Sequence, residues 1–487
     1  MASVVCSMGA ILDFPLYIVN IDCINVICPM APGPDLPYAG WLSAAEAARR
    51  LGIKRETLYA YVSRGMLARR REVGGRESRF DPAEVARLAA RTRSGGRAGR
   101  LDIVIDSALT LLDPIGKLWY RGWDAEAACR SATFEDVAEW LWAAGPAESG
   151  EPAGAPPGAS PATPAATVAF EAPEDVLAVA RRSAGAVAAG TSPIDRLRVA
   201  LPAAATADPL RFDRRPDAVA ASGRRIIAVL VDSLPPAGRN QRAGGTPSAP
   251  AGASPAASST AAPSRAAPPT DGAAGSGRSV AERLWSRLCG ATGTPEQLAV
   301  LDAALVLLAD HEMASSTLAA RVAASTGADP YLVVTAGLAV LGGPLHGSVG
   351  DRLVPTLREA VARGAAEVVA GTWRLGETVG GFGHLVYTHR DPRAAALWPL
   401  LQAAWPDSDV IEATSQLITT VTAHGDAFPN VDLMLGTLVA AAGMVEGSAE
   451  VIFSVARTAG WLAHAIEEYR HRLRFRLRAA YVGPAPA

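Results

Sequence analysis

Apolar residues recur at three- and four-residue spacing along most of the chain, which is the pattern of helices with one buried face. The clearest stretch covers residues 291–311, and four leucines mark its apolar side: Leu298, Leu301, Leu305 and Leu308. Alternating runs are short and few. Two of them, 102–105 and 118–120, predict a small hairpin around the Asp-Pro-Ile-Gly turn at 113–116. The pattern therefore predicts a mainly α fold.

Two stretches, 144–167 and 235–277, interrupt this pattern and consist largely of Ala, Pro, Gly and Ser. Such segments have too few large apolar side chains to form a core, so we expect disordered insertions there. They divide the chain into an N-terminal block (37–143), a middle piece (168–234) and a C-terminal block (278–487). The middle piece is too small to form a domain by itself.

The cellular location follows from three negative features. The longest apolar runs, 331–341 and 433–445, are shorter than the ~18 residues that a membrane span needs. Residues 1–36 form an extension whose apolar start lacks the basic residues of a secretory signal, and Met30 is an alternative start to Met1. The five cysteines are scattered without a CxxC pair, which indicates a reducing compartment. We therefore expect a cytoplasmic protein.

The segment WLSAAEAARRLGIKRETLYAYVSRGML, from Trp41, predicts a helix–turn–helix. Ser43 can cap a first helix whose inner face is formed by small or apolar residues: Ala44, Ala47, Ala48 and Leu51. Gly52 then ends this helix, and a second one is expected over 55–64 with Leu58 and Val62 facing inward. A basic hairpin around 74–75 and a third helix from Asp81 complete a module that we place at 37–95.

This module is also the basic part of the chain. The whole sequence has 46 Lys+Arg and 48 Asp+Glu, whereas residues 41–100 have 15 and 6, a difference of +9. The segment resembles the small winged helix–turn–helix of MerR-like and excisionase-like proteins. That resemblance implies that Lys54, Arg55 and Thr57 face DNA bases, and it places four arginines on phosphates: Arg69, Arg70, Arg71 and Arg76. The alternative is a small helical module with a basic surface that binds protein or nothing.

All seven histidines lie in the C-terminal block: His311, His346, His384, His389, His424, His464 and His471. Two of them stand in glycine-rich settings, His346 in GGPLHG and His384 in GGFGH, and Asp432 stands in FPNVD at the entry to an apolar helix. A partly desolvated carboxylate is a usable base, and imidazoles can polarise carbonyl groups. No HxH, HxxxH or HExxH spacing occurs, so we expect no metal site.

Several ordered segments of this block resemble the citrate synthase family, particularly the bacterial citrate and 2-methylcitrate synthases. The segments are LLADHEMASSTLAARVAASTGADPY (307–331), GGPLHGSVG (342–350), GFGHLVYTHRDPRA (381–394), PNVDLMLG (429–436), SVARTAGWLAHAIEE (454–468) and RLRAAYVG (476–483). Residues 104–142 and 193–202 look like earlier parts of the family. The resemblance thus covers most of 100–483.

The resemblance implies condensation of an acyl-CoA with oxaloacetate and water, giving citrate or 2-methylcitrate and CoA. Asp432 would take the proton of the acyl group, His346 would bind the thioester oxygen, and His384 would polarise the ketone. Four residues would hold oxaloacetate: His311, Arg393, Arg457 and, from the partner subunit, Arg476. CoA is a substrate here, and no cofactor is expected.

The resemblance further implies a homodimer of helical subunits, each with two domains. The large domain would comprise 96–143, 168–234, 278–347 and 446–487, and the small mobile domain 348–445. Four glycines of the small domain could provide flexibility: Gly371, Gly376, Gly380 and Gly381.

The sequence departs from the family on the CoA side. It reads HGSVG where the family reads HGGAN, and GHLVYT where the family reads GHRVYK, so Leu385 and Thr388 replace basic residues near the CoA phosphates. His389 and Arg390 are neighbouring cations that could compensate. Two alternatives to the enzyme remain, a transcriptional regulator that uses the synthase fold as a dimeric metabolite sensor and a catalytically inactive scaffold. The choice between acetyl-CoA and propionyl-CoA is open.

Overall fold

The computed structural model describes residues 41–51, 58–59, 62, 67, 69–71, 78–82, 85, 105–143, 169–237, 277–471 and 473–476. The extension 1–36 and nearly all of the two predicted insertions lie outside these residues. The chain forms two compact units, 1–105 and 106–487.

The first unit has the predicted first helix and hairpin. Helix α1 (Ala44–Leu51) begins with a capping box, in which the Glu46 amide donates to Ser43 Oγ at 3.3 Å and the Ser43 amide donates to Glu46 Oε2 at 2.9 Å. All four residues predicted for its inner face are buried. Strands β1 (Leu42–Ser43), β3 (Ser78–Phe80) and β2 (Arg70–Arg71) form an antiparallel sheet in that order.

The second and third helices of this unit are described only in part. Leu58 and Val62 are helical, and Leu58 is fully buried, as expected for the second helix. Pro82 and Val85 are helical at the expected start of the third. The other predicted residues of both helices lie outside the described ones.

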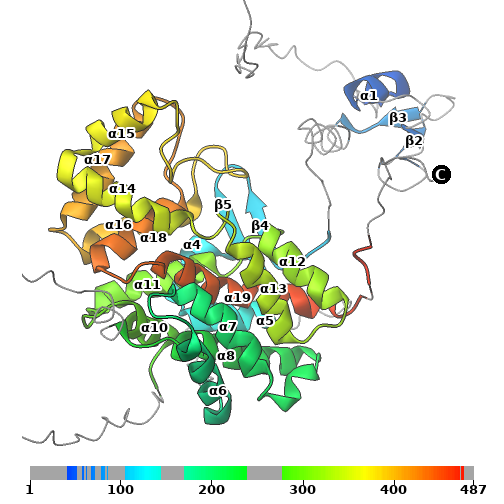
Figure 1. Ribbon diagram of the computed structural model, residues 1–487. Helices are drawn as coiled ribbons and strands as arrows, with labels where there is room; N and C mark the ends of the chain where they lie inside the picture. The colour runs from blue at the N-terminus through cyan, green and yellow to red at the C-terminus, as the bar shows by residue number, and fades with distance from the viewer. Residues whose placement is uncertain are drawn as a thin grey trace, which may run out of the picture. The chain divides into compact units, whose positions relative to one another are not determined.

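The second unit is almost entirely helical, as predicted (Figure 1). Its helices are α4 (Ala125–Ser131), α5 (Phe134–Trp142), α6 (Glu174–Ala186), α7 (Pro193–Ala205), the 3-10 helix η2 (Pro209–Phe212), α8 (Pro216–Asp232), α10 (Val280–Leu288), α11 (Pro295–Leu308), α12 (Ser315–Ser325), α13 (Pro330–Leu341), α14 (Val349–Arg363), α15 (Ala365–Arg374), α16 (Pro392–Ala404), α17 (Asp409–Thr422), α18 (Val431–Ala442) and α19 (Ser448–Glu468). Within the described residues, no helix is long and apolar enough to cross a membrane.

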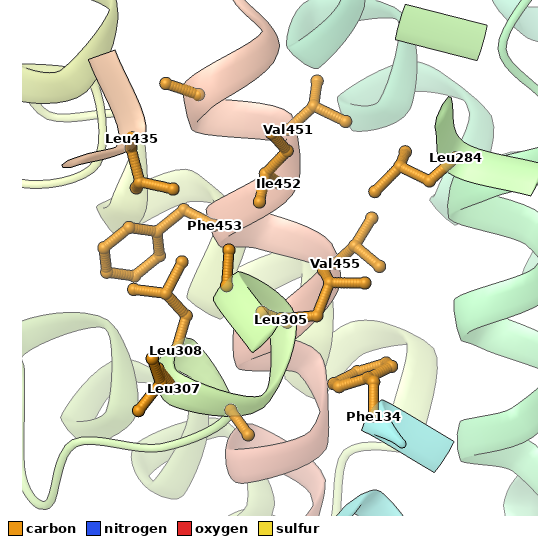
Figure 2. Close-up of a cluster of buried hydrophobic side chains, with 14 of the residues drawn as sticks. Phe134, Leu284, Leu305, Leu307, Leu308, Leu435, Val451, Ile452, Phe453 and Val455 are labelled. Atoms are coloured by element: carbon orange, nitrogen blue, oxygen red, sulfur yellow. The ribbon is translucent and has the colours of Figure 1, made fainter. Parts of the chain in front are cut away.

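Helix α19 is the centre of this unit. Nearly every one of its 21 residues is buried, because it packs against α5, α8, α11, α12 and α13. Figure 2 shows Val451 and Val455 of α19 in one buried cluster with Leu305 of α11, Leu284 of α10 and Phe134 of α5. The segments before, between and after the two insertions thus share one core.

The predicted hairpin is present with a different first strand. Strand β4 (Thr110–Asp113) pairs with β5 (Lys117–Tyr120), and β5 pairs with β6 (Trp123–Asp124). The turn at 113–116 is as predicted, but the strand that pairs with β5 across it is β4 and not the predicted run at 102–105, of which only Ile105 lies within the described residues. A tight turn pairs the residues that flank it directly, and β4 is the run that meets this condition.

Helices α14, α15, α17 and α18 pack on one another and lie together in yellow and orange in Figure 1. They fall within 348–445, the range predicted for the small domain. Helix α16 of the same range packs against α18 and also against α4 and α11. Of the glycines predicted to give flexibility, Gly371 lies inside α15, while Gly376 and Gly381 have positive φ angles of 73° and 85° in the segment that follows.

Candidate active site

His311 stands just past the end of α11, in a turn that several buried groups hold in place. The Tyr120 hydroxyl donates toward the carbonyl oxygens of Val306, Leu307 and Asp310 at 3.1, 3.1 and 3.3 Å. The Gly460 amide of α19 donates to the Ala309 carbonyl at 2.9 Å. The imidazole of His311 is 8% exposed. Its position is therefore fixed by the core.

The segment between α15 and α16 places His384 beside His311, with ring centroids 5.2 Å apart. The amides of Val386 and Tyr387 donate to His384 Nδ1 at 3.0 and 3.3 Å. Burial, and next the charge of Arg393, lower the pKa of His384 to about 4. The ring is therefore neutral near pH 7, and because Nδ1 accepts, its proton is on Nε2.

His346 lies between α13 and α14. Its Nε2 is 2.9 Å from the hydroxyl of Ser316 on α12, and its ring meets Phe453 of α19 edge-on at 5.9 Å. Burial, and next Arg457, lower the pKa of His346 to about 4. This second imidazole is neutral near pH 7 as well.

Asp432 occupies the first turn of α18, where the Asn430 side chain caps the helix by accepting from the amides of Asp432 and Leu433 at 3.0 and 3.3 Å. Burial raises the pKa of Asp432 to about 6, against the opposing charge of Arg393. The group is ionised near pH 7 and remains a stronger base than an exposed aspartate.

Arg393 is buried in a bidentate pair with Asp391. Its Nε and Nη2 donate to the two carboxylate oxygens at 3.0 and 2.9 Å, and the Val431 amide donates to the same carboxylate at 3.0 Å. Burial acts to raise the pKa of Asp391, but the Arg393 guanidinium holds it below its usual range. This pair joins the start of α16 to the start of α18.

Arg457 is a buried guanidinium with unused donors. Its Nε donates to the Leu308 carbonyl at 2.8 Å and its guanidinium lies over the Phe453 ring at 4.7 Å. Its Nη2 is buried and has no hydrogen-bond partner among the described residues. Burial lowers the pKa of Arg457 to about 10, so it remains charged near pH 7. A charged donor in this state favours an anionic ligand.

These residues form one electrostatic group. Burial holds the pKa of His311 well below its usual value, and four neighbouring groups lower it further: Arg393, Arg457, His384 and His346. The charge of Arg393 in turn lowers the pKa of Asp432, and the charge of Asp391 raises it. Arg476 is exposed at the end of the described C-terminal segment.

Two residues of the site, Tyr387 and Ser316, were not predicted to have a role. The Tyr387 hydroxyl is 3.1 Å from His311 Nε2, and Ser316 contacts His346 as described above. Both occur in segments that carry the family resemblance, but a lone Ser or Tyr gives no signal of its own. Their partners, His311 and His346, lie 76 and 30 positions away in sequence.

In the segment predicted to lie near CoA, one of the two cations expected to compensate for Leu385 and Thr388 is already paired. Arg390 donates to Glu126 of α4 at 2.8 Å, while His389 is exposed. The amide and hydroxyl of Thr388 both donate to the Pro114 carbonyl of the β4–β5 turn at 2.9 Å. Leu385 is 81% exposed. This segment is thus fastened to the hairpin and α4 by polar contacts.

The residues predicted to contact DNA fall mostly outside the described ones. Lys54, Arg55, Thr57 and Arg76 lie outside them, and Arg71 is described only as part of β2. Arg69 and Arg70 are exposed, and Arg70 lies over the Trp41 ring at 5.7 Å.

Curated relatives of the chain are named citrate synthases. Citrate synthase 2 of Bacillus subtilis is 34% identical over 209 residues, which are 42% of this chain and 56% of that protein. The citrate synthase of Saccharolobus solfataricus is 36% identical over 206 residues, 39% of this chain and 53% of that protein. The chain thus spans about half the length of the curated relatives it matches.

Solved structures show the same fold over a larger share. Citrate synthase from Thermotoga maritima has a TM-score of 0.57 and 25% identity, covering 79% of this chain and 95% of that one. Citrate synthase from Thermoplasma acidophilum, solved as a ternary complex with carboxymethyl coenzyme A and oxaloacetate, has a TM-score of 0.58 and 23% identity, covering 81% of this chain and 97% of that one.

Two family models match the sequence. The helix-turn-helix domain model matches residues 41–93, which lie within the first unit described above. The model of the citrate synthase C-terminal domain matches residues 102–478, well over half of the chain and all of the site residues. The chain therefore belongs to the citrate synthase family.

Proposed function

We propose that this protein condenses an acyl-CoA with oxaloacetate and water, releasing citrate or a 2-alkyl homologue and free CoA. The observation that carries the proposal is the combination of a carboxylate with a raised pKa, Asp432, and two neutral imidazoles, His346 and His384, in one electrostatic group. Forming a carbon nucleophile from a thioester needs a base and donors for the developing oxyanion.

In this proposal Asp432 removes a proton from the carbon next to the thioester carbonyl. His346 donates to the thioester oxygen as the enol forms, and the Ser316 hydroxyl at 2.9 Å holds its ring. His384, with its proton on Nε2, donates to the ketone oxygen of oxaloacetate and then protonates the new alkoxide. Water hydrolyses the resulting thioester and releases CoA.

Oxaloacetate is a dianion, and the site supplies charged donors for it. Arg457 has a buried Nη2 without a partner in the described chain. His311 and Arg393 complete the set within one chain, and we assign Arg476 to the site of a partner subunit in a homodimer. The reaction needs no resident cofactor, because the thioester itself activates the carbon.

We further propose that the helices within 348–445 move as a small domain against a large domain formed by 96–143, 168–234, 278–347 and 446–487. Closure of such a domain would exclude water while the enol exists. Cys129 and Cys289 are buried free thiols, which is consistent with a cytoplasmic enzyme.

The test is the release of CoA thiol from acetyl-CoA and, separately, propionyl-CoA, each with and without oxaloacetate. We expect oxaloacetate-dependent release by the wild type and a loss of at least ~100-fold in Asp432→Asn, which keeps the size of the side chain and removes the base. The ratio of the CoA release rates with acetyl-CoA and with propionyl-CoA identifies the preferred acyl donor. No release from either donor would overturn the proposal.

A second function, DNA binding, is favoured by the first unit. It matches a helix-turn-helix domain, carries the +9 difference of residues 41–100, and exposes Arg69 and Arg70. We expect the full chain to retard genomic DNA fragments in a gel at low salt, and to lose that retardation when both arginines are changed to Ser. A metabolite-sensing regulator would in addition change its retention with oxaloacetate, and no retention at low salt would exclude both roles.

A further inference from the structure

Tyr387 contacts several residues of the site, although none of the roles described above involves it. Its side chain is 2% exposed. Its hydroxyl lies 3.1 Å from His311 Nε2, its ring centroid is 4.7 Å from that of His384 at a 32° tilt, and its amide donates to His384 Nδ1. Arg393 lies over the same ring at 5.8 Å. One tyrosine therefore touches both imidazoles and one guanidinium.

The protonation states of the two groups favour one direction for the hydrogen bond between Tyr387 and His311. Burial raises the pKa of Tyr387, so the phenol keeps its proton, and His311 is neutral because its own pKa is held low. A phenol is the better proton donor of the two and an imidazole nitrogen the better acceptor. The hydroxyl then donates to Nε2, which puts the single proton of His311 on Nδ1.

The backbone that carries Tyr387 is held on its C-terminal side. Thr388 donates twice to the Pro114 carbonyl, Arg390 pairs with Glu126, and Asp391 accepts from the Val431 amide. These contacts reach the hairpin, α4 and α18. The phenol is thus held by three separate elements, and it contacts both histidine rings.

We propose that Tyr387 is a positioning residue that fixes the tautomer of His311 and the ring orientation of His384. The inference rests on the proposed condensation, in which both histidines contact oxaloacetate. Its hydroxyl acts on His311 and its ring on His384, so the two effects are separable by substitution.

Tyr387→Phe removes the hydroxyl and keeps the ring and the amide. We expect the KM for oxaloacetate to rise about 5- to 10-fold, as for the loss of one net hydrogen bond, with the KM for acyl-CoA unchanged and kcat within about threefold. Tyr331→Phe is the matched control, because Tyr331 is also buried and its hydroxyl donates to a carboxylate, that of Asp208, at 3.0 Å. The control is expected to lower the thermal midpoint without changing either KM.

Tyr387→Leu removes the ring as well, and we expect a further fall of at least about tenfold in kcat. The tautomer is read without activity by 15N NMR of histidine-labelled protein, in which the His311 signal is assigned by its loss in His311→Gln. The wild type should show the proton on Nδ1, and Tyr387→Phe should show a mixture.

The outcomes separate the two proposals. A wild type that releases CoA but has the same KM for oxaloacetate as Tyr387→Phe would overturn the positioning role and leave the condensation standing. So would a His311 tautomer that is the same in both proteins. A wild type that releases no CoA would overturn the proposed function, while the NMR comparison would still test the contact itself.

Discussion

Asp391 and Arg393 form a bidentate ion pair across two residues of sequence, and both side chains are almost completely buried, at 1% and 3% exposure. The same carboxylate receives the Val431 amide at the start of α18, next to Asp432. The pair therefore sets both a proposed substrate-binding cation and the helix that carries the proposed base.

Asp391→Asn should destabilise the second unit by about 3–5 kcal/mol, because it leaves a buried guanidinium without its counter-charge. Chemical denaturation of the wild type and the variant measures this difference. Asp407→Asn is a suitable control, since Asp407 is an exposed carboxylate in the turn before α17. Equal stability of Asp391→Asn and the wild type would show that the pair contributes little.

The same pair gives a pH dependence of stability. The pKa of Asp391 is lowered in the folded protein, so its contribution is present above the unfolded value of 3.8 and is lost as the pH falls through the lower folded value. The stability difference between wild type and Asp391→Asn should therefore shrink below about pH 4. A difference that stays constant down to pH 2 would contradict this assignment.

Asp432→Asn should make the protein more stable while it removes activity. The folded pKa of about 6 lies above the unfolded value of 3.8, so ionised Asp432 destabilises the fold at neutral pH by about 1–3 kcal/mol. This penalty grows as the pH rises from about 4 to 6, and it is absent where both states are protonated. Thermal melts at pH 7.5 and pH 3.5 test the prediction, and a variant that melts below the wild type at pH 7.5 would contradict it.

The rate of the proposed reaction should depend on pH through the same carboxylate. We expect kcat/KM to rise with pH up to about 6 and then level off, because Asp432 must be ionised to act as a base. His346 and His384, with pKa values of about 4, are already neutral over this range. A profile whose acidic limb is centred near pH 4 would assign the limb to the histidines instead.

Arg457→Gln should weaken the stabilisation of the protein by oxaloacetate. A ligand that binds only the folded state stabilises it by RT ln(1 + [L]/Kd), and the loss of a charged hydrogen bond to a carboxylate weakens binding by about 1.5–3 kcal/mol, so a given thermal shift should need a correspondingly higher oxaloacetate concentration. Arg363→Gln is the control, because Arg363 is exposed on α14 and pairs with Glu359 and Glu367. Thermal shift in a series of oxaloacetate concentrations measures the effect, and an undiminished shift would remove Arg457 from the site.

Gly460→Ala should damage the turn that carries His311. A methyl group at Gly460 would meet Asp310 Oδ1 and would lie 2.5 Å from the Ala309 carbonyl, and neither neighbour can move freely in this core. We expect a loss of about 1–3 kcal/mol in stability together with a higher KM for oxaloacetate. Gly371→Ala, in open space on α15, should be neutral or slightly stabilising.

The sequence predicted the helical character and the first helix of the N-terminal unit. Periodicity located α11, and motifs singled out His346, His384 and Asp432, because glycine-rich settings around titratable groups are visible along the chain. The partner strand of β5 was misplaced, since pairing depends on the turn more than on alternation. Tyr387 and Ser316 were missed because their importance lies in a single hydroxyl contact made across the fold.

The hairpin and α4 lie before the first insertion, yet they hold segments of the site that come 190 to 274 positions later: Tyr120 fixes the turn of His311, and Pro114 and Glu126 fasten the segment after Tyr387. The parts of the chain before and after residues 144–168 are therefore complementary pieces of one folded unit. A chain cut within that stretch retains every one of these contacts as an interface between fragments. Co-expression of the two halves thus offers a split version of the protein, in which assembly of the fragments and completion of the site are the same event.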